Sequence, residues 1–528
     1  MIPNSDNDLD DSLLGTSNNA NPRRHRKRKR SSVQEAIASD PWCLGEKALA
    51  VSSFTGVSEL KKPLPENELG FLRLFITEFL VKFLTQESNR YARKIMSETE
   101  FSSYELISVV EMNRFICILI YMGIDDKPTF EHYWKKKDNP FYNDFCSKLL
   151  TFERFKTIKK VFHVFDNYVY NDLESQNVSF SKLDGLIEYF NKKFAEVYSP
   201  ERDLAVDENM CPWSGRGGSK VYMPLKPVKY GIKSYALCES KTGYACALIQ
   251  YNSRKPETNL NMLVRLTKNY QNKFHHLYMD NFYTSVKVIE AMAEKGIYCC
   301  GTLRDNRGGP KDIKKIVKRF KKGEGLVYTN DLINCIGLMD NGPVAILTNI
   351  HSSIVANTSG DEDEGNLSKS NVVKDYNSYM GGVDLMDQMT GYYGINRRSK
   401  KWTTKFCFHI LNIAIHNSYV LYKKFSSGTQ KKTYLHYLIK LIYELGENIV
   451  ADFPEEDHVC TPQNQQDHSF NGDDRTILHF PIKIVKRKQC VVCKSYSKRT
   501  EIKTGCSKCL VPLCLLNCFE EYHNGPRE

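Results

Sequence analysis

The sequence lacks any apolar stretch long enough to cross a membrane. Its longest apolar run, Phe115 to Ile124, has ten residues, whereas a membrane-spanning helix needs about 20. The first residues, from Met1 to Asp6, are polar and contain no apolar core of a signal peptide. We therefore expect a soluble, intracellular protein without a membrane partner, in a compartment where disulfides are rare.

The amino-terminal region first lacks basic residues and then becomes densely basic. Residues 1–22 carry four acids and no Lys or Arg, and residues 1–68 are expected to form a disordered N-terminal region. Arg23 to Arg30 holds seven Lys or Arg and one His in eight residues. Such a run predicts a nuclear localisation signal that a nuclear import receptor binds. A nucleic-acid-binding arm or a solvated basic tail would have the same composition.

Length and charge limit the possible classes of protein. A chain of 528 residues is too long for a single hydrophobic core, so several domains are expected. Its hydrophobic content of 41% is typical of a globular protein. The 74 Lys and Arg exceed the 62 Asp and Glu, which gives a net charge of +12. Because this excess is unevenly distributed, it favours an anionic partner such as nucleic acid.

Apolar periodicity divides the chain into helical and mixed segments. Residues 69–202 are expected to form a helical domain, because apolar side chains recur there at helical spacing. Its predicted helices include Leu69–Arg93, Met112–Met122 and Thr151–Phe165. Residues 203–303 predict an α/β unit. Its strands and its helix are expected at Leu204–Asp207, Tyr230–Cys238, Tyr244–Tyr251, Phe274–Met279 and Val286–Lys295.

A basic segment with three short strand patterns interrupts this α/β unit. Eight of the 16 residues from Arg307 to Lys322 are Lys or Arg. The pattern of residues 304–370 predicts a small β-rich insertion that contains an acidic loop at 361–364, after which the α/β unit resumes at 371–393. Two helices are expected within 394–451, a polar linker over 452–485 and a cysteine-rich domain over 486–528.

Several acids occupy positions that suit a divalent metal site. Asp207 and Asp280 each end a predicted apolar strand, and the carboxyl ends of strands are where α/β proteins bind ligands. In the stretch Gly381-Gly-Val-Asp-Leu-Met-Asp387, Asp384 and Asp387 follow two glycines at the spacing i, i+3. That spacing places both on one face of a helix, where they repel unless a metal or a basic partner joins them.

These acids predict phosphoryl-transfer chemistry. Asp207, Asp280 and Asp384 could together hold two divalent cations, as two-metal phosphoryl transfer needs. Ligands that are all oxygen select Mg²⁺ or Mn²⁺ over Zn²⁺. The alternative is that the helical acids form a solvated face and that the strand-end aspartates only cap turns.

A basic segment surrounds Trp402. It contains Arg397, Arg398, Lys400, Lys401 and Lys405. Basic side chains interleaved with an aromatic ring suit a nucleic-acid backbone and an unstacked base. On spacing alone, Trp402 could equally anchor the next helix in the core.

The carboxyl-terminal tail is rich in cysteine. Of 17 cysteines, six lie in the tail, and with a histidine they form a candidate ligand set: Cys490, Cys493, Cys506, Cys509, Cys514, Cys518 and His523. Paired Cys-x2-Cys knuckles predict zinc, because thiolates on a tight turn can surround a tetrahedral ion. Two zinc ions would need eight ligands, one more than this set provides, so either one or two ions could be bound.

Four blocks of the sequence resemble those of piggyBac-type DNA transposases. They are Asp207–Arg216, Tyr278–Ser285, Cys300–Arg307 and Gly381–Asp387, and they occur in the family's order together with the cysteine-rich tail. The resemblance implies an RNase H-like α/β catalytic core interrupted by a small β-rich insertion. It also implies a helical dimerisation/DNA-binding domain in two sequence pieces, a C-terminal cysteine-rich zinc finger and a homodimer. The resemblance further implies that excision proceeds through hairpin intermediates and that integration occurs at TTAA sites.

The resemblance also assigns roles to residues. It implies Asp207, Asp280 and Asp384 as the catalytic triad and Asp387 as a further essential acid. Arg304 and Arg307 match a basic pair associated with target joining, and Trp402 matches an aromatic residue that attends the DNA end. Family members often carry a histidine where this chain has Tyr496, so a second zinc would need another ligand, such as His479.

Three functions remain open at this stage. The first is a Mg²⁺-dependent cut-and-paste transposase that acts on terminal repeats in the nucleus. The second is a domesticated nuclear DNA-binding protein that has lost cleavage activity, for which the acids would be dispensable. The third is a zinc-dependent interaction module with a structural body, which explains the tail but not the acids.

Overall fold

The computed structural model describes residues 42–524, with gaps at 46, 136–138, 140–141, 165–181, 218–219, 225, 227, 253–256, 352–370, 427–431, 448–480, 507–508, 510 and 515–516. The predicted nuclear localisation signal Arg23–Arg30, the acidic loop 361–364, residues 452–480 of the predicted linker and His479 lie outside the described residues. The last residues of the predicted linker, 481–485, instead belong to a strand, β13 (Pro481–Gln489).

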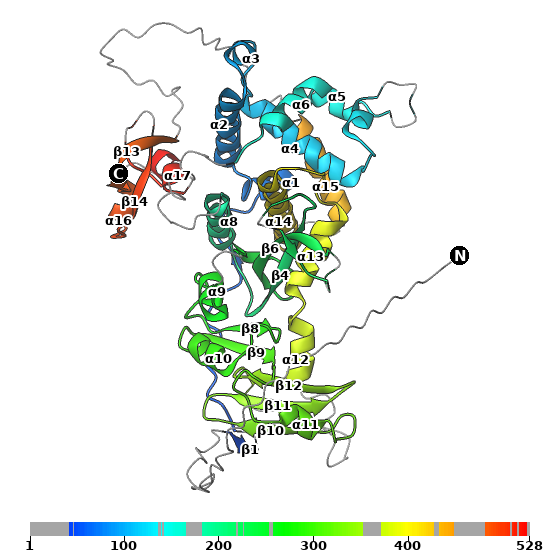
Figure 1. Cartoon of the computed structure of the whole chain (residues 1–528), viewed down its shortest axis with the longest axis vertical. Coiled ribbons are helices and arrows are strands. Elements are labelled where there is room, and N and C mark those ends of the chain that lie inside the picture. The colour runs from blue at the N-terminus through cyan, green and yellow to red at the C-terminus, as the bar shows by residue number, and fades with distance from the viewer. Residues whose placement is uncertain are drawn as a thin grey trace, which may run out of the picture. The chain divides into compact units, whose positions relative to one another are not determined.

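In the described part of the chain, ten strands form one mixed sheet (Figure 1). Strand β4 (Asp203–Pro212) pairs antiparallel with β6 (Tyr230–Glu239) and parallel with β8 (His275–Met279). Beyond β6 follow β7 (Ala245–Gln250) and the short β5 (Val221–Tyr222), and beyond β8 lies β9 (Ile297–Thr302). All five residues of β8 are buried, as expected for a parallel strand covered on both faces. Helices α9 (Asn259–Leu266) and α10 (Val286–Ala293) flank β8 in the sequence.

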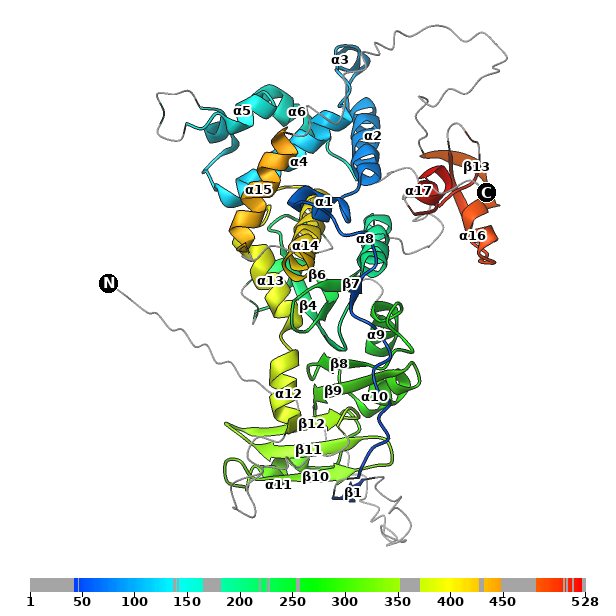
Figure 2. The ribbon, with the colours of Figure 1, turned by 180° about the vertical axis from the view of Figure 1, so that it is seen from behind.

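The strands predicted for the basic segment extend the same sheet. Strands β10 (Gly325–Thr329), β11 (Asn334–Met339) and β12 (Pro343–Thr348) pair antiparallel in that order. β12 pairs with β9, and the short strand β1 (Cys43–Leu44) pairs with β10 at the outer edge (Figure 2). The predicted strands are therefore confirmed, and backbone hydrogen bonds connect them to the α/β unit. A short helix, α11 (Ile313–Val317), holds part of the basic run.

Helices from two distant parts of the sequence form one packed group. The first part contributes α1 (Glu68–Arg73), α2 (Glu78–Ile95), α3 (Glu98–Ser102), α4 (Val109–Ile124), η1 (Phe130–Trp134), α5 (Phe145–Leu149), α6 (Phe152–Val161) and α8 (Asp184–Val197). The second contributes α14 (Trp402–Phe425) and α15 (Tyr434–Glu447). Lys432 pairs with Glu68 at 2.8 Å, and Cys117 Sγ donates to the carbonyl of Ile442. None of the described helices is both long and apolar enough for a membrane span.

The region expected to be disordered does not extend to residue 68, because β1 pairs with β10, β2 (Glu59–Leu60) pairs with β3 (Tyr198–Ser199) and Trp42 is buried. Two predicted boundaries of helices and strands were also wrong. The helix predicted over Leu69–Arg93 is divided, because the Thr77 hydroxyl accepts a hydrogen bond from Leu80 N and starts α2 as a new helix. The strand predicted to end at Asp207 continues to Pro212. Its polar residues stay in the sheet because they have buried partners: Glu208 pairs with Lys233 at 3.1 Å.

The tail has a small core of its own. It contains β13 (Pro481–Gln489), α16 (Val491–Ser495), β14 (Glu501–Cys506) and α17 (Asn517–Asn524), and β13 pairs antiparallel with β14. Cysteine side chains supply much of this core, together with Val492, Leu513 and Phe519. So small an apolar cluster is typical of domains that need a metal to fold.

Candidate active site and cysteine clusters

The parallel pairing of β4 with β8 brings two of the predicted acids together. Val206 lies opposite Met279 in the register. The residues that follow these two are Asp207 and Asp280. The two acids therefore occupy neighbouring positions on adjacent strands, although Asp207 lies in mid-strand and Asp280 follows the end of β8.

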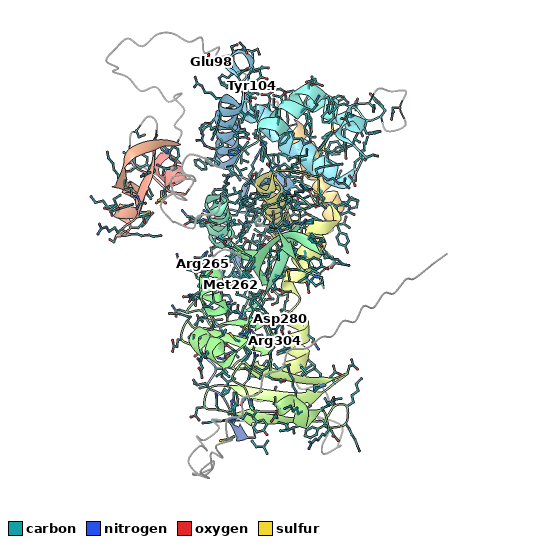
Figure 3. The ribbon with its side chains drawn as sticks, viewed as in Figure 1. Glu98, Tyr104, Met262, Arg265, Asp280 and Arg304 are labelled. Atoms are coloured by element: carbon teal, nitrogen blue, oxygen red, sulfur yellow. The ribbon has the colours of Figure 1, made fainter. Side chains whose placement is uncertain are left out.

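Asp280 is held in place by the turn that follows its strand. Its Oδ1 accepts a hydrogen bond of 2.7 Å from Phe282 N, and its carbonyl accepts one of 2.8 Å from Thr284 Oγ1. Burial raises the pKa of the Asp280 carboxyl, while the Phe282 amide and the nearby Arg304 oppose the shift. Figure 3 labels Asp280 and Arg304 at the same part of the sheet. Asp280 therefore caps the turn, as the alternative interpretation predicted, and is at the same time a half-buried acid next to Asp207.

Helix α13 (Gly382–Tyr392) carries the other two acids, as the spacing predicted. The helix can begin here because its residue 382 is glycine: a Cβ at Gly382 would lie only 3.0 Å from the carbonyl oxygen of Glu239 at the end of β6. Asp384 is 74% exposed, whereas Asp387 is turned toward β4 and bonded to it. The two acids share a helix but have different surroundings.

A buried hydrogen-bond network fixes Asp387. Its Oδ1 accepts a 2.5 Å hydrogen bond from Asn209 Nδ2 of β4. The side-chain oxygen of Asn209 in turn accepts from Ser234 Oγ at 2.9 Å and lies 2.6 Å from His409 Nε2 of α14. Burial raises the pKa of Asp387 to about 7, although Asn209 and Lys226 lower it. This network connects α13, β4, β6 and α14 at the level of the acids.

A lysine lies between the acids of the sheet and of the helix. Lys226 Nζ is 3.2 Å from Asp207 Oδ2, 4.0 Å from Asp384 Oδ1 and 3.3 Å from the carbonyl oxygen of Glu208. Burial and a hydrogen bond to Glu208 raise the pKa of Asp207 to about 7, and Lys226 opposes that shift. Burial would also raise the pKa of Glu208, but its bonds to Asp207 and Lys233 lower it.

This arrangement is compatible with a divalent cation. Over the described residues, no three carboxylates bring an oxygen each to within 4.8 Å of one another. Asp207 and Asp384 instead both approach the Lys226 ammonium. Carboxylate oxygens are the donors that Mg²⁺ and Mn²⁺ prefer. The site already holds one positive charge, the Lys226 ammonium, which both Asp207 and Asp384 approach. The donor set therefore fits the predicted metal.

The predicted basic pair borders Asp280. Arg304 is exposed, and its Nε donates to Asn281 Oδ1 at 2.6 Å. Arg307 is half-buried, with Nη2 3.4 Å from the carbonyl of Phe282. Both arginines thus contact residues directly after Asp280.

The basic segment around Trp402 divides into internal and exposed residues. Arg397 is 13% exposed, pairs with Asp126 at 2.9 Å and donates to the carbonyl of Lys127. Lys401 donates to the carbonyl of Lys160, and Trp402 is half-buried against the main core.

The exposed residues of this segment lie on a loop tied to β4. Arg398 and Lys400 are exposed. The indole of Trp213, just after β4, donates to the carbonyl of Ser399 at 3.1 Å. Of the predicted DNA contacts in this segment, Arg398 and Lys400 have the most accessible side chains.

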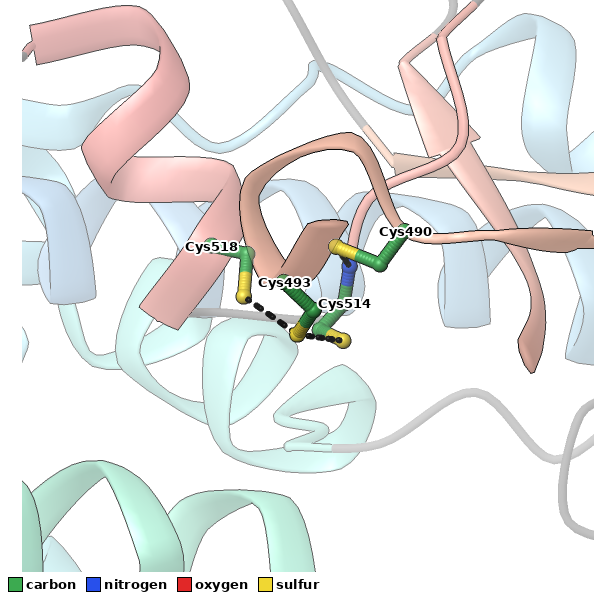
Figure 4. A group of neighbouring side chains, drawn as sticks. All are labelled: Cys490, Cys493, Cys514 and Cys518. Atoms are coloured by element: carbon green, nitrogen blue, oxygen red, sulfur yellow. Dashed lines mark hydrogen bonds between the residues drawn. The ribbon is translucent and has the colours of Figure 1, made fainter. Parts of the chain in front are cut away.

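The tail cysteines form two clusters rather than one. Cys490, Cys493, Cys514 and Cys518 lie with their sulfurs within 4.8 Å of one another (Figure 4). Cys506, Cys509 and His523 form a second group within the same limit. The first Cys-x2-Cys pair, Cys490 and Cys493, thus joins Cys514 and Cys518, whereas the second pair joins His523. The two clusters therefore alternate along the chain.

Both clusters have features of zinc ligands. The hydrogen bond between the two thiols lowers the pKa of Cys518 to about 6 and raises the pKa of Cys514, so Cys518 is the member of this pair that more readily takes the thiolate form that metals bind. His523 Nδ1 lies 2.7 Å from the carbonyl of Phe519, which leaves Nε2 directed at Cys509 Sγ, 3.5 Å away. A ligating histidine is commonly oriented in this way. Tyr496, at the position where a histidine was expected, hydrogen-bonds to Glu521.

Sequence reasoning missed three participants in the acidic site: Lys226, Asn209 and His409. Glu208 and Asn209 directly follow Asp207, and a longer strand with buried polar residues could have been inferred from them. For Lys226 and His409 no local signal existed, because their partners lie 19 and 200 positions away.

The class of protein to which this mixed sheet and its acids belong is given by comparison with known families. The Transposase IS4 family matches residues 67–419, well over half of the chain, so the chain belongs to this family. It is of the piggyBac type, as its relatives indicate.

The relatives include two human proteins and one solved structure. The chain is 26% identical over 483 residues to human PiggyBac transposable element-derived protein 3, covering 86% of this chain and 75% of the relative. It is 24% identical to human PiggyBac transposable element-derived protein 2, covering 86% and 76%. The fold matches the cryo-EM structure of a piggyBac transposase synaptic complex with hairpin DNA, with a TM-score of 0.64, 20% identity, and coverage of 85% of this chain and 95% of that one.

Proposed function

We propose that this protein is a metal-dependent cut-and-paste transposase that cleaves DNA at element ends and joins it to TTAA targets. The observation that carries the proposal is the placement of Asp207 and Asp280 on adjacent strands, with Asp384 approaching the same lysine as Asp207. The strand order β7-β6-β4-β8-β9, antiparallel and then parallel, supports an RNase H-like core.

Asp207, Asp280 and Asp384 would hold Mg²⁺ or Mn²⁺. Such ions activate the attacking oxygen and stabilise charge on the leaving oxygen in phosphoryl transfer. The chain's own residues fix the geometry: the β4–β8 register aligns the two strand acids, and Gly382 lets α13 approach the sheet. Asp387 acts as a positioning residue, because its bond to Asn209 attaches α13 to β4.

Double-stranded DNA is the proposed partner. The solved structure similar to this chain is named as a complex with hairpin DNA. Arg304 and Arg307, beside Asp280, suit target DNA, while Arg398 and Lys400 suit the donor end. Arg397, Lys401 and Trp402 would act mainly by supporting that loop. The tail clusters would bind Zn²⁺ and recognise terminal repeats, and the protein would act as a homodimer.

The site of action would be the nucleus. Replacing the basic residues of Arg23–Arg30 with Ala should leave a tagged protein mostly cytoplasmic, because an import receptor binds clustered positive charge. Unchanged nuclear fluorescence would place the signal elsewhere in the chain.

The function is tested by nicking of a terminal-end duplex. Asp207→Asn and Asp384→Asn keep the size of the side chain and remove the charge that attracts a metal, so cleavage should fall by about two orders of magnitude or more at matched DNA binding. Cleavage at the wild-type rate by either variant would show that the triad is wrong.

The second candidate is a nuclear DNA-binding protein that no longer cuts. It is favoured by the names of the human relatives, which describe them as derived from a transposable element. A wild-type protein that binds the ends and never nicks them, with either Mg²⁺ or Mn²⁺, would select this candidate. A zinc-dependent interaction module would leave the buried acid network without a role.

A further inference from the structure

Lys226 occupies an unusual position for a flexible side chain. It comes from the loop between β5 and β6, where Met223 N bonds to the carbonyl of Lys229 and closes a hairpin. From there its ammonium reaches Asp207 and Asp384, which belong to the sheet and to α13. A single positive charge thus joins two carboxylates from separate elements.

This ammonium also lies 3.3 Å from the carbonyl oxygen of Glu208, so it contacts three residues of the acidic site. Without a cation, several carboxylates this close would repel one another. Lys226 therefore does electrostatically what a metal ion would do in the same place.

A second lysine of the site shows what a permanent structural counter-ion looks like. Lys233 projects from β6, pairs with Glu208 at 3.1 Å and is 10% exposed. Its ammonium also lies over three aromatic rings, those of Tyr235, Tyr251 and Phe282. Such a lysine cannot leave without exposing a buried carboxylate.

Lys226 differs from Lys233 in exposure and in the element that carries it, although its pair with Asp207, at 3.2 Å, is nearly as close as that of Lys233 with Glu208. Its side chain is 24% exposed, it comes from a loop rather than a strand, and its contact with Asp384 is as long as 4.0 Å. Asp384 itself is 74% exposed. The ammonium is held by a close ion pair with Asp207, a hydrogen bond to the carbonyl of Glu208 and a long contact with the exposed Asp384. Its departure would leave Asp207 without a partner unless another cation took its place, so a cation that binds both carboxylates is what can displace it.

We propose that Lys226 is a built-in, displaceable counter-ion that occupies the cation position between Asp207 and Asp384 until a divalent metal replaces it. This inference rests on the proposed function, because it takes Asp207 and Asp384 as metal ligands. In the metal-free protein Lys226 keeps the acids together. Metal binding must release it, which weakens the affinity for metal and frees the ammonium for another anion.

The first test measures metal binding rather than cleavage. Mn²⁺ is titrated into the full-length protein and its free concentration is followed by electron paramagnetic resonance. Lys226→Met should bind Mn²⁺ on the order of tenfold more tightly than the wild type, because no ammonium competes for the site. Lys229→Met, an exposed lysine of the same hairpin, should bind like the wild type. Equal or weaker binding by Lys226→Met would overturn the proposal.

The second test uses the wild-type chain and needs no substitution. Amine acylation followed by mass spectrometry reports how accessible each lysine is. Adding Mn²⁺ should raise the labelling of Lys226 several-fold and leave that of Lys229 and Lys233 unchanged. Labelling of Lys226 that stays constant or decreases would contradict displacement, even if the variant failed to fold.

A third variant separates this inference from the proposed function. As a single substitution in a chain that keeps Lys226, Asp207→Asn should abolish the tight Mn²⁺ site. If Mn²⁺ binding does not depend on Asp207, the metal assignment fails and the inference fails with it. If binding depends on Asp207 but Lys226→Met has no effect, only the role of Lys226 is wrong.

Discussion

The acidic site and the tail clusters place their candidate ligands in opposite ways. The tail ligands come from residues 490–523, close in sequence, and already lie within 4.8 Å of one another in two groups. The acids come from positions 207, 280 and 384. Asp207 and Asp384 approach a lysine instead of one another, and Asp280 follows the strand next to that of Asp207. A local ligand set is formed by turns and short elements, whereas a dispersed set depends on the packing of a whole domain. The first suits a structural metal and the second an exchangeable one.

The largest effect should come from the acidic site. Asp280→Asn removes a charge beside Asp207 while Asn can still accept the hydrogen bond from Phe282, so we expect strand cleavage to fall by about 100-fold or more with little loss of stability. Nicking rates and zinc content should be measured together. Asp305→Asn, at an exposed acid nearby, is the matched control and should cleave normally. Loss of zinc from Asp280→Asn would mean that the two regions are coupled.

The next effect should be confined to the tail. Cys514→Ser breaks the group of four thiols, so the full-length protein should lose about one zinc ion, and end-specific DNA binding should weaken by about 10- to 100-fold. Zinc is measured by plasma mass spectrometry, and circular dichroism should show the rest of the fold unchanged. Cys43→Ser, at an exposed cysteine outside the clusters, should change neither value. A tail that stays folded without zinc would contradict the assignment.

The basic pair should produce a smaller and selective effect. Neutralising Arg304 and Arg307 together should reduce target joining by about tenfold and excision less, because both side chains lie beside Asp280 without bonding to its carboxylate. The quantity to compare between this variant, the wild type and the control is the ratio of integration to excision. A Lys318→Ala/Arg319→Ala variant removes the same charge from the same segment and serves as the control. Equal loss of both steps would indicate general DNA affinity, which salt dependence would reveal.

The smallest effect concerns the stability of the metal-free acidic site. Burial raises the pKa of Asp387 to about 7, whereas an aspartate in an unfolded chain has a pKa of about 4. Between these two pH values the folded state holds a proton that the unfolded state has released. This residue therefore makes the protein less stable as the pH rises from about 4 to 7. Asp387→Asn should remove that part of the dependence.

The measurement is the melting temperature of the variant minus that of the wild type, taken without metal. The difference should increase by about 2 °C between pH 5 and pH 8. Burial lowers the pKa of His409 to about 3, so it stays neutral in the folded state over this range and affects stability only through its protonation in the unfolded state. That contribution is present in both proteins, and the subtraction removes it. A difference that is independent of pH would mean that Asp387 is ionised throughout.

The sequence by itself determined the local features. The spacing of Asp384 and Asp387 predicted the helix that carries them, and Cys-x2-Cys pairs predicted the clusters, because helical periodicity and knuckle geometry depend on residues within a few positions. Strand patterns gave the elements of the sheet. The end of β4 was misjudged, because Glu208 and Asn209 looked too polar for a strand whose buried partners come from elsewhere.

Only the tertiary structure decided what lies around the acids. Lys226 reaches them from a loop, and Asn209 and His409 fix Asp387 from a strand and a helix. Arg397, predicted to contact DNA, pairs with Asp126 instead. The adjacency of Asp207 and Asp280 comes from the register of two parallel strands. Such pairings are set by packing between segments far apart in the chain, and local sequence patterns do not encode which distant polar groups will meet.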